Sequence, residues 1–308
     1  MNNTKEVLEL LPQHITDLLK SIGSLDSIQE IRMKVNKPLM LQAGNDEIIT
    51  KYMVSIQDIR LVLQHISNYS IYAFEEEIKQ GYLTIKGGHR VGICGSCIIE
   101  DNRVKTIKNL GSLNIRICHE ILGCSNKIMP YMIHNNEIIN TVIISPPRCG
   151  KTTLIRDISR NISNGVENLK LFGKKVCVID ERSEISSCYN GVPQMNLGLR
   201  TDVMDNCPKA EGIMMAIRSM APEVIVCDEI GTFKDMESII MALNSGVKLI
   251  TTIHGYGVED LYSRPIFKDI MDNKAFKRAI VLSSDKGVGT VNYVYDFEKK
   301  DKLWRLVG

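Results

Sequence analysis

The stretch that decides the fold is Thr141-Val-Ile-Ile-Ser-Pro-Pro-Arg-Cys-Gly-Lys-Thr-Thr153, in which an apolar, β-branched run breaks into a short polar loop. Its Cys149-Gly-Lys-Thr152 segment matches the second half of Gly-x-x-x-x-Gly-Lys-[Ser/Thr], the pattern of a phosphate-binding loop between a buried strand and a helix. Ser145 stands where that pattern has its first glycine, so we expect the sharp turn to be made by Ser145-Pro146-Pro147. A strand, a phosphate-binding loop and a helix that begins near Gly150 are therefore predicted.

The predicted loop has the chemical groups that bind a nucleoside triphosphate. Main-chain N–H groups from Arg148 to Thr152 can point into one concavity at the helix N-terminus, where unpaired donors and the helix dipole favour an anion. We expect Lys151 to reach the β- and γ-phosphate oxygens and the Thr152 hydroxyl to ligate Mg²⁺. A chance Gly-Lys-Thr at an ordinary helix start is the alternative. The expected nucleotide-binding residues are Ser145, Pro146, Pro147, Arg148, Cys149, Gly150, Lys151, Thr152 and Thr153.

Cys149 carries a separate expectation. It lies at a predicted helix N-terminus between Arg148 and Lys151, and both features favour a thiolate. We therefore expect a reactive thiol that bound ATP protects from alkylation.

Composition and charge limit the class of protein. The 308 residues suffice for two domains, and 44% hydrophobic with 24% charged residues is typical of a soluble globular protein. A net charge of +2 argues neither for nor against nucleic acid, and any basic face must be local. With one Trp and no interleaving of aromatic and basic residues, nucleic acid is not an expected partner. A charged, amphipathic N-terminus and the lack of any long apolar run predict neither a signal peptide nor a membrane span, and hence a cytoplasmic protein.

The nine cysteines are scattered, and those inside apolar runs are typical of buried, reduced thiols. Cys94-Gly-Ser-Cys97 is a Cys-x-x-Cys pair, and with Cys118 and Cys124 a four-thiolate zinc site can be drawn. The alternative is two thiols at the end of a hairpin.

Residues 1–125 are expected to form a small α+β domain. Helical periodicity predicts a first helix in two pieces, with Pro12 opening the second piece and Gly23 ending it. Alternating patterns predict three short strands over 28–35, 38–42 and 48–49 and a hairpin over 82–93. Between them we expect a helix that Ser55 caps and a second helix over 72–80.

Residues 126–308 are expected to form an α/β domain with a mainly parallel sheet. Solid apolar runs alternate with helical segments, which is typical of parallel strands covered on both faces. The four runs cover residues 142–144, 176–179, 224–227 and 247–251. Turns at 286–289 and 298–302 predict a late hairpin. Ligands bind at the carboxyl ends of such strands.

Polar residues with suitable chemistry follow each later strand. Asp180-Glu-Arg-Ser-Glu184 is an acidic segment, or else an ordinary solvated loop. Asp228-Glu229 has the arrangement of a Walker B motif, in which Asp228 holds Mg²⁺ and Glu229 orients the attacking water, unless Asp228 only caps the next helix. His254 is either structural or a hydrogen-bonding partner of the γ-phosphate and the carboxylates.

In this order, the phosphate loop, the acidic segment, Arg218-x-x-x-Pro-Glu-Val-Ile-Val-Cys-Asp-Glu229 and Thr251-Thr-Ile-His-Gly255 resemble the secretion ATPases of type II and type IV systems. Over nearly its full length the chain is similar to the stage III sporulation AA family of endospore-forming bacteria, because Glu30-Ile-Arg-Met-Lys-Val35 and Gly87-Gly-His-Arg-Val-Gly92 also fit. The resemblance implies a RecA-like P-loop ATPase core after a smaller N-terminal domain.

The resemblance also implies roles and partners. Glu181 and Glu184 fall on the acidic box, Asp228 and Glu229 on Walker B and His254 on the histidine box, with ATP and Mg²⁺ as cofactors. It implies an ATPase that energises a channel complex of membrane proteins between mother cell and forespore, and so a peripheral position on the mother-cell side of the engulfing membrane. Asp228-Glu229-Ile-Gly231 departs from the Gly-Glu-Ile-Arg that is usual in secretion ATPases.

We also expect a closed ring, a homo-hexamer, because the γ-phosphate requires positive charge beyond Lys151 and Mg²⁺ and a neighbouring subunit can supply an arginine. The candidates are Arg90, Arg116, Arg200 and Arg218, with Arg200 ranked first. Two other functions stay open from the sequence: a nucleic-acid-stimulated RecA-like ATPase, and a structural ring that nucleotide stabilises.

Overall fold

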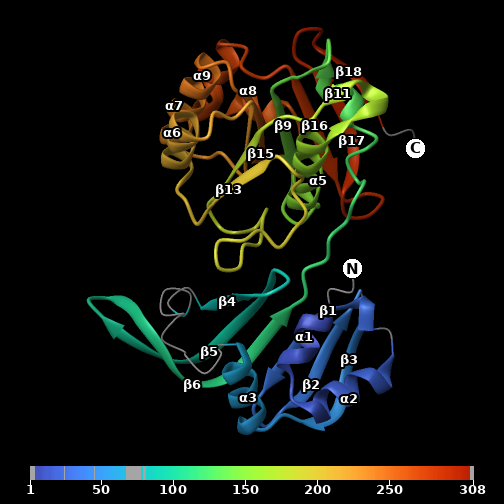
Figure 1. Cartoon of the computed structure of the whole chain (residues 1–308), viewed down its shortest axis with the longest axis vertical. Coiled ribbons are helices and arrows are strands. Elements are labelled where there is room, and N and C mark those ends of the chain that lie inside the picture. Colours follow the sequence, from blue (N-terminus) through green and yellow to red (C-terminus); the bar gives the residue numbers. More distant parts are fainter. Residues whose placement is uncertain (1–3, 24, 45, 67–77, 79–80, 306–308) are drawn as a thin grey trace. The chain divides into compact units, whose positions relative to one another are not determined.

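The computed structural model describes residues 4–23, 25–44, 46–66, 78 and 81–305 (Figure 1). The chain divides into two compact units. The first comprises Met1–His119 with the loop Ser187–Gln194, and the second comprises Glu120–Ser186 and Met195–Gly308. The units divide between His119 and Glu120. The domain boundary expected from the sequence is at residue 125. None of the helices in the described part of the chain combines the length and apolar character of a membrane span.

The first unit is built on a six-stranded antiparallel sheet in the order β3-β2-β1-β6-β5-β4. Its strands are β1 (Ile28–Lys34), β2 (Pro38–Ala43), β3 (Asp46–Met53), β4 (Tyr82–Ile85), β5 (His89–Glu100) and β6 (Arg103–Arg116). Its helices are α1 (Lys5–Leu10), α2 (Gln13–Ile22), the 3-10 turn η1 (Leu25–Ser27) and α3 (Ile56–Ile66). One apolar core joins the helices to one face of the sheet, because buried side chains of α1, α2 and α3 pack with those of the strands. The predicted α+β pattern is confirmed for this unit.

Local signals explain where these helices begin and end. Pro12 stands at the N-cap of α2 and Gly23 at its C-cap with φ 79°, as predicted. Ser55 and Asp58 bond to each other's backbone at the start of α3. The helix expected over 72–80 lies outside the described residues, apart from Ile78.

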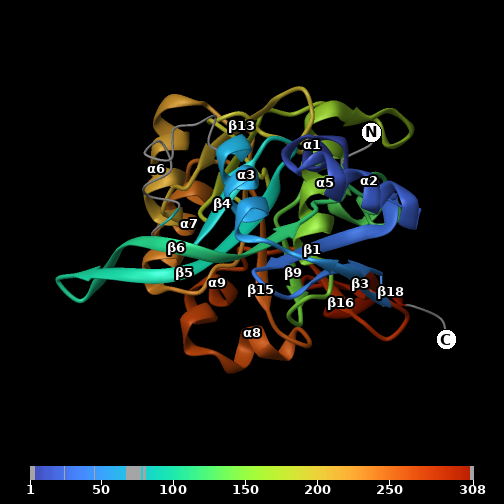
Figure 2. The same ribbon diagram turned by 90° about the horizontal axis from the view of Figure 1, so that it is seen from below.

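The hairpin predicted over 82–93 is the antiparallel pair β4 and β5, and β5 forms a second, longer hairpin with β6 that the sequence pattern did not predict (Figure 2). Beyond Cys94 the β5 side chains are exposed, so this part carries no core pattern that could have been read in advance. Cys94 and Cys97 lie here, within the strand and exposed, with Cys118 beyond the end of β6. Among the described residues no group of three or more His, Cys, Asp or Glu side chains could hold a metal ion, so the four-thiolate alternative is not supported.

The second unit contains an eight-stranded sheet in the order β13-β12-β14-β15-β9-β16-β17-β18. These strands are β9 (Thr141–Ser145), β12 (Val176–Asp180), β13 (Thr201–Asp205), β14 (Val224–Cys227), β15 (Lys248–His254), β16 (Arg278–Ser283), β17 (Thr290–Asp296) and β18 (Asp301–Arg305). The strands from β13 to β16 are parallel, and β17 and β18 continue the sheet antiparallel. The four predicted parallel strands and the late hairpin are confirmed.

Helices cover both faces of this sheet (Figure 1). They are α5 (Lys151–Asn164), α6 (Lys209–Ser219), α7 (Phe233–Asn244), α8 (Glu259–Ser263) and α9 (Lys268–Asp272). Alternate strand residues face opposite ways: Val176 and Val178 pack with α5, whereas Cys177 and Ile179 pack with α6 and α7. The solid apolar runs in the sequence follow from this double coverage.

The remaining elements of the second unit are short. They are η3 (Met129–Met132), the pairs β7 (Ile133–His134) with β8 (Glu137–Ile138) and β10 (Gly165–Val166) with β11 (Leu171–Phe172), η4 (Glu167–Leu169) and η5 (Pro265–Phe267).

Candidate functional site

The predicted phosphate loop connects β9 to α5. Every residue of β9 is buried, and α5 begins at Lys151 with Gly150 as its N-cap. The left-handed backbone falls on Arg148 (φ 61°) and Gly150 (φ 82°), and not on Ser145. The loop therefore makes its turn without needing a glycine at position 145.

Gly150 is required by packing as well as by its φ. A Cβ at this position would lie 3.0 Å from both N and Cα of Gly289 and 3.3 Å from Cγ1 of Val288. The Gly289 N–H also donates to the Cys149 carbonyl at 3.1 Å. The turn between β16 and β17 thus supports the phosphate loop from one side.

The loop leaves main-chain donors at the start of α5. The first hydrogen bond of the helix runs from the Leu154 N–H to the Gly150 carbonyl at 3.0 Å, so the N–H groups before Leu154 have no partner within the helix. These donors and the helix dipole fit an anion, and Lys151 adds a full positive charge. The residues present therefore suit the phosphates of a nucleotide.

Lys151, Glu229 and His254 form one polar cluster, although they come from α5 and from the ends of β14 and β15. Lys151 Nζ lies 3.3 Å from His254 Nε2 and 3.8 Å from Glu229 Oε2, and His254 Nε2 lies 3.1 Å from Glu229 Oε1. Parallel strands bring these residues to one edge because their carboxyl ends meet there. A lysine, a carboxylate and an imidazole are therefore in mutual contact beside the phosphate loop.

The backbone at Asp228-Glu229 is held by Thr252 of β15, whose side chain is fully buried. The Thr252 hydroxyl donates to Asp228 Oδ1 and accepts the Glu229 N–H at 2.9 Å. Glu229 has φ 26°, a conformation that costs a non-glycine residue about 1–3 kcal/mol. Thr252 thus offsets strain at the residue predicted to position water, a role that the sequence analysis did not assign to it.

Asp180 holds the acidic segment in shape. Its buried carboxylate accepts N–H bonds from Glu184, Ile185 and Ser186 at 2.8–3.0 Å, and the Ser186 hydroxyl at 2.6 Å. These bonds close the loop, and Glu181 and Glu184 line the cavity described below together with Asp180.

Glu181 is paired with Lys209, a residue that the sequence analysis missed. Lys209 Nζ lies 2.5 Å from Glu181 Oε2, and the lysine is almost fully buried. Burial opposes the charge on Lys209, but the hydrogen bond with Glu181 and the attraction of the nearby acidic groups, Asp235 among them, together outweigh burial and raise the pKa of the lysine above its ordinary value. Lys209 is the first residue of α6, and nothing in the sequence around it indicates a contact with Glu181.

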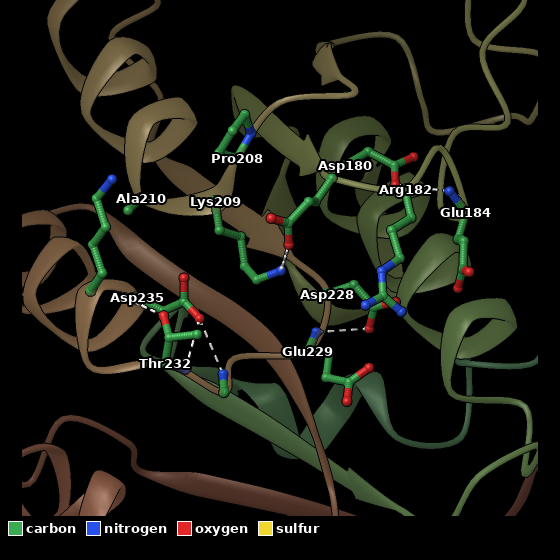
Figure 3. A pocket seen from close by; sticks show the side chains of 13 residues that line it. Asp180, Arg182, Glu184, Pro208, Lys209, Ala210, Asp228, Glu229, Thr232 and Asp235 are labelled. Carbon is green, nitrogen blue, oxygen red and sulfur yellow. Dashed lines mark hydrogen bonds and ion pairs between the residues drawn. The ribbon is translucent and has the colours of Figure 1, made fainter. Parts of the chain in front are cut away.

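A cavity of about 650 Å³ opens between the ends of β12 and β14 and the starts of α6 and α7 (Figure 3). Six carboxylates and three cations line it, so it has an excess of negative charge and suits a cation better than a phosphate. The carboxylates belong to Asp180, Glu181, Glu184, Asp228, Glu229 and Asp235, and the cations to Arg182, Lys209 and Lys234. Arg182 extends toward Asp228 (Figure 3).

The predicted metal ligands can be compared with this geometry. The Thr252 hydroxyl and the Glu229 N–H both donate to Asp228 Oδ1. Oδ2 of the same carboxylate can therefore bind a cation. Since no cluster of protein ligands is present there, a cation would take further oxygens from phosphate and water, which is how Mg²⁺ binds. Thr152 follows Lys151 in the first turn of α5. The alternative in which Asp228 only caps a helix does not hold, because Thr232 and Asp235 form the capping box of α7.

The four candidate arginines lie outside the lining of the cavity. Arg200 precedes β13 at the amino edge of the sheet, where its Nη1 donates to the Ser163 carbonyl at 3.0 Å. Within its own chain it is therefore at the opposite edge from Lys151. Of the other candidates, Arg90 and Arg116 are paired in register on β5 and β6 of the first unit, and Arg218 lies in the last turn of α6.

Cys149 is buried, with 4% of its surface exposed, and packs in the apolar core under α5. This burial argues against the readily alkylated thiol expected from the sequence, because the loop directs the side chain inward.

Comparison with known proteins places the chain in a family. The family model described as "Sporulation stage III, protein AA" matches residues 1–303. The stage III sporulation protein AA of Bacillus subtilis (strain 168) is 43% identical over 293 residues, which cover 94% of each chain.

Solved structures show the same fold at low identity. The ATPase DotB of Legionella pneumophila has a TM-score of 0.62 and 15% identity, over 93% of this chain and 81% of DotB. The pilus retraction motor PilT with bound ADP has a TM-score of 0.58 and 13% identity, over 90% and 77%. The fold is thus the RecA-like α/β fold expected, and the chain belongs to the stage III sporulation protein AA family.

Proposed function

We propose that this protein is an ATP-hydrolysing motor subunit of the secretion-ATPase kind. The observation that carries the proposal is the contact of Lys151 with Glu229 and His254 beside a phosphate loop. The fold, which is similar to those of the ATPase DotB and the motor PilT, supports the same proposed function.

The roles follow from the positions of the side chains. The amides of the phosphate loop and Lys151 would hold the phosphates, while Thr152 and Asp228 would hold Mg²⁺, which neutralises charge on the phosphate oxygens. Glu229 would orient a water whose oxygen attacks the γ-phosphorus as the bond to the bridging oxygen of ADP breaks.

Lys151 and Glu229 are coupled in this scheme. In the structure, the Lys151 ammonium group lies beside the Glu229 carboxylate. When Lys151 turns to the phosphates, that carboxylate loses its cation and becomes available to water. Binding of the nucleotide would therefore itself activate Glu229, while His254 keeps it in place.

Glu181 and Glu184 would act from the neighbouring cavity, with Lys209 fixing the position of Glu181. We further propose that the working form is a homo-hexamer at the mother-cell side of the engulfing membrane. There it would energise a channel complex of membrane proteins. The family's sporulation name supports this setting.

Phosphate release from Mg-ATP by the purified chain tests the catalytic proposal. Lys151→Ala should abolish ATP binding, whereas Glu229→Gln should retain binding and lose about 10²- to 10⁴-fold in turnover. Exposed Glu167→Gln, in the same unit, is the matched control and should leave turnover unchanged. Turnover at the wild-type rate in Glu229→Gln would reject the role of Glu229, and failure of the wild-type chain to bind ATP would reject the function.

A further inference from the structure

We infer that the turn between β16 and β17, residues 284–289, forms the subsite for the base of the nucleotide, and that Val288 is the side chain the base contacts. This inference rests on the proposed function. It assigns a binding role to a segment that the catalytic scheme does not use.

The turn lies directly against the phosphate loop. The Gly289 N–H donates to the Cys149 carbonyl at 3.1 Å, and Val288 Cγ1 lies 3.3 Å from the position that a Cβ on Gly150 would take. β16 is also the parallel neighbour of β9, so the carboxyl end of β16 adjoins the start of the loop. A molecule held by the loop therefore has this turn at its side.

The order of the strands fixes which end of the nucleotide faces the turn. Glu229 follows β14 and His254 ends β15; both strands lie on one side of β9, and β16 lies on the other. Hydrolysis takes place at the γ-phosphate, so that end of the triphosphate must point toward Glu229. The nucleoside is at the other end of the same chain and consequently extends toward β16 and its turn.

The chemistry of the turn suits the face of a base. The Val288 side chain is 74% exposed, so it contributes little to the core. Covering an exposed apolar side chain with a flat ring removes apolar surface from water and is favourable. An aliphatic side chain makes no hydrogen bond, so Val288 should support adenine and guanine nucleotides to the same extent.

The test compares two probes by calorimetry in the presence of Mg²⁺: ATP and inorganic tripolyphosphate, which has the phosphates without the nucleoside. Val288→Ser should weaken ATP binding by about four- to ten-fold and leave tripolyphosphate binding unchanged. Val288→Ile, which keeps the apolar surface, should bind ATP as the wild type does. The matched control is Val192→Ser, because Val192 is an exposed valine (59%) in the loop grouped with the first unit.

Each outcome decides the question. Equal weakening of both probes by Val288→Ser would mean that the turn supports the phosphate loop only, and would overturn the inference. Unchanged binding of both probes would place the base elsewhere and overturn it as well. If the wild-type chain binds ATP no more tightly than it binds tripolyphosphate, the nucleoside gains nothing from the turn, and the inference fails while the phosphate site stands. Binding of neither probe to the wild-type chain would overturn the proposed function together with the inference.

Discussion

The hydroxyl of Thr252 on β15 donates a hydrogen bond to the carboxylate of Asp228 at the end of the neighbouring strand β14. The same hydroxyl oxygen accepts the N–H of Glu229 at 2.9 Å, so one buried side chain fixes both acidic residues. The two carboxylates proposed to hold the metal and the water are thus positioned by a residue that does neither.

Thr252→Val keeps the shape of the side chain and removes this hydroxyl. We expect turnover to fall by about ten- to a hundred-fold with ATP affinity nearly unchanged, because the carboxylates lose their alignment while the phosphate loop stays intact. Steady-state phosphate release and calorimetric ATP binding measure the two effects separately.

The matched control is Thr251→Val, because Thr251 is equally buried on the same strand and its hydroxyl contacts the Cys227 thiol at 3.4 Å. Thr252→Ser should restore most of the turnover. Similar losses in Thr251→Val and Thr252→Val would show that only the packing of β15 matters.

Asp157 on α5 predicts a dependence of stability on pH. Burial alone would raise the pKa of this carboxyl. Bonds from the N–H groups of Ser125 and Gly123, from the Ser125 hydroxyl and from Arg160 outweigh burial and lower that pKa below its ordinary value. The stabilisation is therefore complete above the ordinary pKa of about 3.9 and is lost as the pH falls through the lower folded pKa.

Urea unfolding followed by Trp304, the single tryptophan, reports on the second unit. Asp157→Asn should lower the free energy of unfolding near neutral pH by about 2 kcal/mol and flatten its decline in acid. Exposed Asp202→Asn is the control and should change neither. A parallel acid decline in wild type and Asp157→Asn would assign the effect to other carboxylates.

Alkylation should distinguish the cysteines by burial. Cys94 and Cys97 are exposed, and Cys149 is buried, so iodoacetamide should modify the first two well before Cys149, with or without Mg-ATP. Burial also raises the pKa of Cys177 to about 12 and that of Cys227 to about 11, so these should react only after unfolding. Peptide mass spectrometry over a time course measures each rate. Labelling of native Cys149 as fast as Cys94 would contradict the buried position.

Mixing two inactive variants tests whether Arg200 acts across a subunit interface. If it does, Lys151→Ala subunits, which keep Arg200, should restore activity to Arg200→Ala subunits in a mixed ring. If Arg200 serves only to bond the end of α5 through Ser163, Arg200→Ala should instead lower stability and gain nothing from mixing. Mass measurements in Mg-ATP give the oligomer size, and a monomer would reject the ring.

The sequence alone determined the parallel strands, the phosphate loop and the acidic residues at strand ends. Each of these depends on local signals: apolar runs of strand length, a glycine before a helix, and carboxylates directly after a buried run. The topology then required Lys151, Glu229 and His254 to meet, because the ends of neighbouring parallel strands share one edge of the sheet.

Only the tertiary structure decided what each of these residues contacts. Asp180 and Glu181 are neighbours in sequence, yet one closes a loop and the other pairs with Lys209, because alternate strand-end side chains face different surroundings. The inward position of Cys149 and the position of Val288 beside Gly150 likewise depend on packing between segments far apart in the chain. Such contacts are set by strand register and by the shape of the core, and neither leaves a periodic signal in the sequence.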